Sequence, residues 1–70
     1  MTEFEQTKEL AEQGDADAQY NLAVMYLQGV DVTQDHAEAI WWLTNAAEQG
    51  HAHAQFWVDN LKNGWRVKND

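Results

Sequence analysis

The sequence has 70 residues, enough for one small domain and no more. Twelve acidic residues against four basic ones give a formal net charge of -8, which disfavours binding to nucleic-acid phosphates and to anionic membranes. The chain contains neither cysteine nor serine, which excludes disulfides, a thiolate nucleophile, a cysteine-ligated zinc site and a serine triad.

The sequence is expected to be helical throughout and to form a single domain over residues 1–70. The glycines at positions 14, 29, 50 and 64 mark the expected helix ends, and no proline interrupts the segments between them. Asp15 and Asp35 stand where a carboxylate caps the following helix. The helices are expected at about residues 2–13, 16–28, 36–49 and 52–63, followed by a tail at 64–70.

Apolar residues recur at helical spacing in the second and third segments, which predicts that one face of each is buried. In the second segment this face consists of Ala18, Leu22, Met25, Tyr26 and Gly29. In the third it consists of Ala39, Leu43, Ala46, Ala47 and Gly50. The small residues allow neighbouring helix axes to approach closely, whereas the more polar first helix is expected to act as an N-terminal cap.

A segment of the chain is repeated. Residues 11–19 recur as residues 47–55, with seven of nine positions identical at an offset of 36 residues. A period in the mid-thirties is the length of a helix-turn-helix unit in a helical solenoid. The sequence therefore predicts two such units stacked against each other.

Two spacings carry a family resemblance. One is Ala-x-x-Trp-x-x-x-Ala-Ala-x-x-Gly from Ala39 to Gly50, and the other is Leu-x-x-x-Tyr-x-x-Gly from Leu22 to Gly29. The chain resembles the Sel1-like repeat, a relative of the tetratricopeptide repeat, over essentially its whole length. The resemblance implies an all-α fold, a short right-handed α/α superhelix of about two repeats and four helices. It also implies a protein-protein adaptor without catalysis or cofactor.

Four aromatic residues are candidates for contacting a partner. Trp41 and Trp42 are about 100° apart on one helix, so they cannot both occupy the centre of the apolar face. Trp42 neighbours the alanine face, which leaves Trp41 either as a contact anchor or packed against a neighbouring element. Tyr20 is expected to be exposed, and Trp57 is either a core residue or a surface aromatic. Trp65, in the tail, either covers the last helix or binds a partner.

No group of residues has the spacing of a catalytic or metal site. His51 and His53 are two apart, so their side chains would point in nearly opposite directions from a helix, and a third ligand is missing. His36 is interpreted as a partly buried packing residue. The glutamates of the first helix, Glu5, Glu9 and Glu12, are interpreted as a solvated surface.

The sequence thus favours a small cytoplasmic adaptor or scaffold that binds another protein or peptide, and neither an enzyme nor a binder of nucleic acid or membranes. The N-terminus shows no targeting signal, and no run of about 18 apolar residues is present. An acidic inhibitor that occupies a basic nucleic-acid-binding surface is the alternative, supported by the charge of -8. Because the fourth helix lacks a successor, we also expect its apolar face to be covered by self-association or by docking of another chain.

Overall fold

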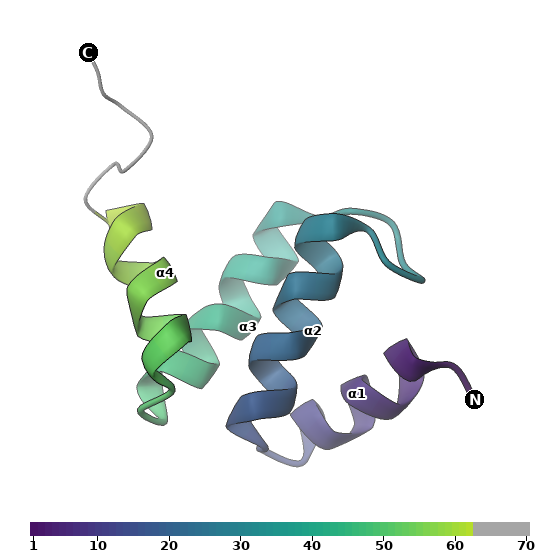
Figure 1. The fold of residues 1–70 in the computed structure, drawn as a ribbon. Coiled ribbons are helices and arrows are strands. Elements are labelled where there is room, and N and C mark those ends of the chain that lie inside the picture. The colour runs from purple at the N-terminus through teal and green to yellow at the C-terminus, as the bar shows by residue number, and fades with distance from the viewer. Residues whose placement is uncertain (63–70) are drawn as a thin grey trace.

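A computed structural model of the chain describes residues 1–62, with the side chains of residues 1–61. These residues form four helices and no strand, so the expected all-α fold is confirmed (Figure 1). The helices are α1 (Glu3–Glu12), α2 (Ala16–Gln28), α3 (His36–Glu48) and α4 (Ala52–Lys62). Each bound lies within one residue of the sequence prediction. The predicted tail, including Trp65, lies outside the described residues.

Side chains at the helix starts satisfy backbone N–H groups that have no partner within the helix. Thr2 and Glu5 form a reciprocal capping box at α1, so the first predicted helical residue lies just outside the helix. Asp15 Oδ1 accepts from the Ala18 N–H at 2.9 Å, and Asp35 Oδ1 accepts from the Glu38 N–H at 3.0 Å. The predicted roles of both aspartates as caps are confirmed.

The two turns within the repeated segment have the same hydrogen bonds. The Asp15 N–H donates to the Leu10 carbonyl at 3.2 Å, and the His51 N–H donates to the equivalent Ala46 carbonyl at 3.1 Å. Gly14 and Gly50 adopt φ angles of 101° and 91°, a left-handed region that disfavours side chains. The sequence repeat is therefore also a structural repeat.

The longer loop joins α2 to α3 and is tied back to the end of α2. The Gln34 side chain donates to the Leu27 carbonyl at 2.6 Å, and the Asp35 N–H donates to the Tyr26 carbonyl at 3.0 Å. Asp31 has a φ of 60°, which aspartate tolerates better than most residues. The loop thereby sets where α3 begins relative to α2.

Helices α2 and α3 pack side by side at the centre, with α1 against α2 and α4 against α3 (Figure 1). Alanines dominate the buried face, and Leu22 and Leu43 are fully buried between them. Small side chains let the helix axes approach closely, so a chain of this size still encloses a core. The buried apolar residues that form this core cluster are Ala11, Ala18, Leu22, Ala23, Ala39, Trp42, Leu43, Ala46 and Ala54.

A glutamine side chain makes the same contact in both copies of the repeat. Gln19 Nε2 donates to the Ala11 carbonyl and Gln55 Nε2 to the equivalent Ala47 carbonyl, each at 3.1 Å. Gln19 is buried and also accepts from Gln49 Nε2 at 2.8 Å, whereas Gln55 is exposed. One buried amide thus joins the ends of α1 and α3 to the start of α2.

Because the two glutamines differ mainly in burial, they form a matched pair for measuring how much the buried contact contributes to the free energy of unfolding. Gln19→Leu keeps the volume but removes both hydrogen bonds, and we expect it to lower the free energy of unfolding by about 1–3 kcal/mol. Gln55→Leu should lower it by less than about 1 kcal/mol, because water replaces the lost partner. Urea unfolding followed by circular dichroism at 222 nm measures both. Equal losses would contradict the role assigned to Gln19.

Candidate functional site

Adjacent tryptophans on α3 lie on different sides of the helix. Trp42 is 7% exposed and belongs to the core, whereas Trp41 is 57% exposed. The two indoles meet edge to face, with ring centroids 4.7 Å apart and an interplanar angle of 89°. The prediction that Trp42 takes the buried position is confirmed. The exposed Trp41 indole therefore packs against the buried Trp42 indole.

Trp41 borders an open groove of about 490 Å³ that we call the α1–α3 groove. Its walls come from α1 and α3, and the buried Gln19 of α2 lies at its base. The residues that line it are Lys8, Ala11, Glu12, Gln19, Glu38, Trp41, Trp42 and Asn45. The groove therefore combines an aromatic wall with charged and amide side chains.

Hydrogen bonds hold the α3 wall of the groove in place. Trp42 Nε1 donates to Glu38 Oε2 at 3.2 Å, which fixes this carboxylate one helical turn before the indole. Asn45 Nδ2 donates to the Trp41 carbonyl at 3.1 Å. Both polar side chains are thus oriented before any ligand arrives, which lowers the entropy cost of binding.

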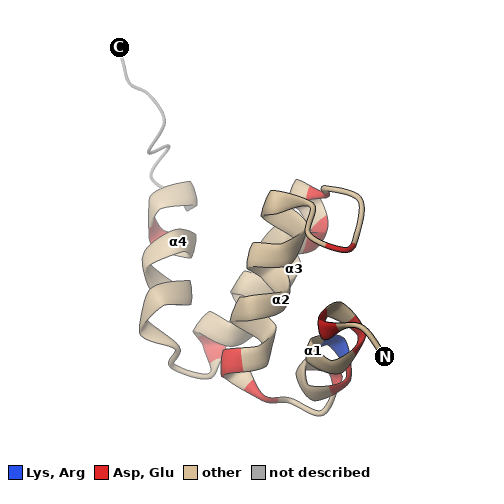
Figure 2. Ribbon diagram, turned by 45° about the vertical axis from the view of Figure 1, so that its right-hand side comes forward, with Lys and Arg blue, Asp and Glu red and all other residues tan. Residues whose placement is uncertain are grey.

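The groove lies in a negative field. Burial raises the pKa of Tyr26 above its ordinary value of 10.0, and three carboxylates raise it further. In order of decreasing effect they belong to Glu38, Asp35 and Glu12. Lys8 is the only lysine or arginine among residues 1–61, and the blue stretch of α1 in Figure 2 lies among red acidic positions. Since Tyr26 packs edge to face on Phe4 of α1, at 5.7 Å, the field acts where α1, α2 and α3 meet.

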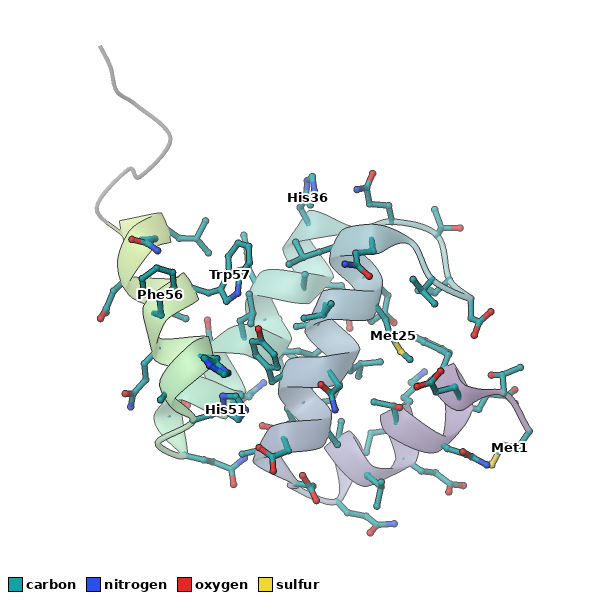
Figure 3. The ribbon with its side chains drawn as sticks, viewed as in Figure 1. Met1, Met25, His36, His51, Phe56 and Trp57 are labelled. Atoms are coloured by element: carbon teal, nitrogen blue, oxygen red, sulfur yellow. The ribbon has the colours of Figure 1, made fainter. Side chains whose placement is uncertain are left out.

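The other predicted aromatics do not join Trp41. Tyr20 is only partly exposed, because it packs against the core and stacks on His51 with ring centroids 4.7 Å apart, so the expectation of an exposed tyrosine is wrong. Trp57 is partly buried, points from α4 toward α3 and packs against the core (Figure 3). It matches the core interpretation more closely than the surface one.

The histidines have structural positions. His51 Nδ1 accepts from the Ala54 N–H at 3.2 Å, and His51 Nε2 lies 3.1 Å from Asp17 Oδ1. Both ring nitrogens therefore have protein partners, and His51 caps α4 as Asp15 caps α2. His36 is exposed and points away from the helices at the start of α3, so the expectation that it is a packing residue is wrong (Figure 3). In the described part of the chain, no three histidine or carboxylate side chains are grouped to hold a metal ion.

Sequence reasoning did not foresee that polar residues of two helices form one groove. It placed Glu12 on a solvated surface where Lys8 pairs with glutamates, and it placed Glu38 and Asn45 on the same side of the third helix as Trp41. These residues meet only because α1 and α3 both pack on α2, and no local pattern gives that register. It also missed Phe56, which is 67% exposed on α4.

Comparison with known proteins agrees with the repeat seen in the structure. The Sel1 repeat model matches residues 16–51, which span α2, the loop, α3 and the turn leading to α4. The chain belongs to the Sel1 repeat family. Sel1 repeats generally mediate protein-protein interaction and are typically non-catalytic. Within this Sel1 chain, the matched repeat supplies Trp41 and the α3 wall of the groove.

A sel1-like repeat-containing protein of Acanthamoeba polyphaga mimivirus is 40% identical to this chain over 49 residues. The similar region covers 70% of this chain but 8% of the viral protein, so the chain spans a small part of that relative. No solved structure matches the chain.

The raised pKa of Tyr26, caused first by burial and then by nearby carboxylates, gives a test of its surroundings. An unfolded tyrosine ionises near its ordinary pKa of 10.0, whereas the folded protein resists ionisation at Tyr26. Stability from this group is therefore complete below pH 10 and is lost as the pH rises through the folded pKa. We expect Tyr26→Phe to lose less thermal stability than the wild type between pH 8 and pH 11. Parallel losses in the two proteins would show that folding does not raise the pKa of Tyr26.

Proposed function

We propose that this Sel1 chain is a non-catalytic adaptor that holds a segment of another protein or peptide in the α1–α3 groove, with Trp41 as the anchor. The observation that carries the proposal is the exposure of Trp41, at 57%, on the edge of a groove of about 490 Å³. Tryptophan is prominent among residues that supply most of the binding energy of an interface. A few polar groups beside an apolar wall are what fixes the orientation of a bound segment.

Contacts within α3 hold the Trp41 side of the groove in place, which supports a role of Trp41 in binding. The Trp41 ring rests against Trp42, which is itself buried, and the Trp41 carbonyl accepts from Asn45. A partner that covers Trp41 therefore orders few further groups in this protein.

The charge of the chain bears on which partners we expect. Its net charge of -8 opposes nucleic acid and anionic membranes, so we propose a protein or peptide partner and no nucleic-acid or membrane binding. None of the four described helices has the length and apolar character that a membrane span requires. The lack of cysteine is compatible with the cytoplasmic location that we propose.

A peptide selection tests the proposed function. A random twelve-residue peptide library displayed on phage would be selected on the full chain, and the best peptides would be titrated against variants. Trp41→Ala should weaken a selected peptide roughly thirtyfold, about 2 kcal/mol. Ile40→Ala is the matched control, because Ile40 is an exposed apolar residue on the same helix, 42% exposed, and does not line the groove. It should change the affinity by less than about threefold.

Peptides that bind both variants equally well would contradict the proposed function. Thermal melting by circular dichroism must show that both variants remain folded, because Trp41 also contacts Trp42.

An acidic inhibitor of a basic nucleic-acid-binding surface is the second candidate. Its support is the distribution of charge: Lys8 is the one basic side chain among many acidic ones in residues 1–61 (Figure 2). Such a complex would weaken steeply as salt is raised from 50 to 500 mM and would not depend on Trp41. Binding anchored by Trp41 should retain much of its affinity at high salt.

A second copy of the chain is the partner that we propose for the outer face of α4. Phe56 occupies the repeat position of Tyr20 but is 67% exposed, whereas Tyr20 packs against the core. A hollow of about 330 Å³ also lies between α3 and α4, and Ala47 and Val58 are among its lining residues. Covering this face would remove apolar surface from water.

Sedimentation velocity at rising protein concentration measures this self-association. The wild type should shift toward a dimer, and Phe56→Glu should remain a monomer because it places a charge in the contact. A wild type that stays monomeric at high concentration would contradict self-association while leaving the groove proposal intact.

A further inference from the structure

Trp41 lines two hollows, and both contain carboxylates. One is the α1–α3 groove, with the carboxylates of Glu12 and Glu38. The other is a shallower hollow of about 320 Å³, lined by Asp35, Ala37, Glu38 and Trp41. Glu38 borders both hollows, so a carboxylate stands beside the exposed indole whichever hollow a ligand enters.

Trp42 positions both the Trp41 indole and the Glu38 carboxylate. Its buried ring supports Trp41 edge to face at 4.7 Å, and its Nε1 donates to Glu38 Oε2 at 3.2 Å. The carboxylate and the indole are therefore held by one fixed side chain. This fixes the distance between an aromatic surface and a negative charge, which is the arrangement that binds an organic cation.

The charges around Trp41 indicate which sign of charge a bound side chain carries. Glu12 and Glu38 line the α1–α3 groove and Asp35 lines the second hollow, whereas Lys8 is the single basic residue among the residues that line them. An acidic side chain placed against Trp41 would meet repulsion from these carboxylates, whereas a basic one would neutralise them.

We propose that Trp41 and Glu38 form a receptor for a cationic side chain, arginine in preference to lysine, presented by the bound segment of the partner. This inference rests on the proposed function, since the cation enters the groove as part of that segment. The guanidinium plane stacks on the indole while its edge donates to the Glu38 carboxylate, with Glu12 in one hollow or Asp35 in the other adding charge. Arginine is favoured over lysine because its planar group can stack and donate in a fork at the same time.

The peptides selected on the full chain provide the first test. Those that depend on Trp41 should be enriched in arginine relative to the unselected library. The strongest such peptide would then be synthesised with citrulline in place of each arginine, because citrulline keeps the shape and removes the charge. Citrulline at the contacting position should weaken binding to the wild type at least tenfold.

Variants of the protein locate the contact. Glu38→Gln removes the charge but keeps an oxygen that accepts from Trp42 Nε1, so the indole pair should remain in place. Glu48→Gln is the matched control, because Glu48 lies on the same helix but lines the hollow between α3 and α4. We expect Glu38→Gln to reduce the tenfold citrulline effect to less than threefold, and Glu48→Gln to leave it unchanged.

Each failure has a distinct meaning. If no selected peptide depends on Trp41, the proposed function itself is overturned. If peptides depend on Trp41 but carry no excess of arginine, or if citrulline has no effect, the groove stands and the cation receptor is overturned. If Glu38→Gln and Glu48→Gln reduce the citrulline effect equally, the charge acts diffusely, as an acidic inhibitor would use it, and the receptor is likewise overturned.

Discussion

Two neighbouring tryptophans on a single helix cannot share one buried face, and this constraint shapes the surface of the molecule. Residues next to each other on a helix point about 100° apart, so burying Trp42 turns Trp41 outward. Trp42 is drawn inward because α2 and α3 meet along alanines, which leave room for an indole beside them. The exposed tryptophan is therefore a direct consequence of the packing that stabilises the core. Once Trp42 is fixed, the position of Trp41 and the orientation of Glu38 follow.

The groove in turn depends on how the repeat stacks its helices. Gln19 donates to the end of α1 and accepts from Gln49 at the end of α3, so one buried amide joins both walls of the groove at its base. The equivalent Gln55 makes the first of these contacts and is exposed. The same structural unit recurs with an offset of 36 residues. The groove lies where α1 and α3, the equivalent helices of the two copies, both pack on α2. Family membership explains the stacking of the helices.

Local patterns predicted most of the fold. The glycines, the capping aspartates and the apolar stripes each act within a few residues, so the helix ends and most of the buried faces were predictable from spacing. Gly29 and Gly50 were assigned to those faces but are exposed, because they lie beyond the last helical turn. Helical geometry likewise predicted that one of the two adjacent tryptophans is less buried, but it left open whether Trp41 packs against a neighbouring element. Tyr20 was mistaken for a surface residue because its partner, His51, comes from the next repeat. The contribution of Lys8 and Glu12 to the groove was equally hidden, since it requires the packing of α1 beside α3.

The most direct test of the groove is a map of where a selected peptide lies on the chain. Heteronuclear NMR of the labelled full chain would follow backbone amides and the four indole N–H groups during a titration. The largest shifts should fall on the Trp41 indole and on the amides of Lys8, Glu12, Glu38 and Asn45. Shifts confined to α4 around Phe56, with Trp41 unchanged, would contradict the groove as the binding surface.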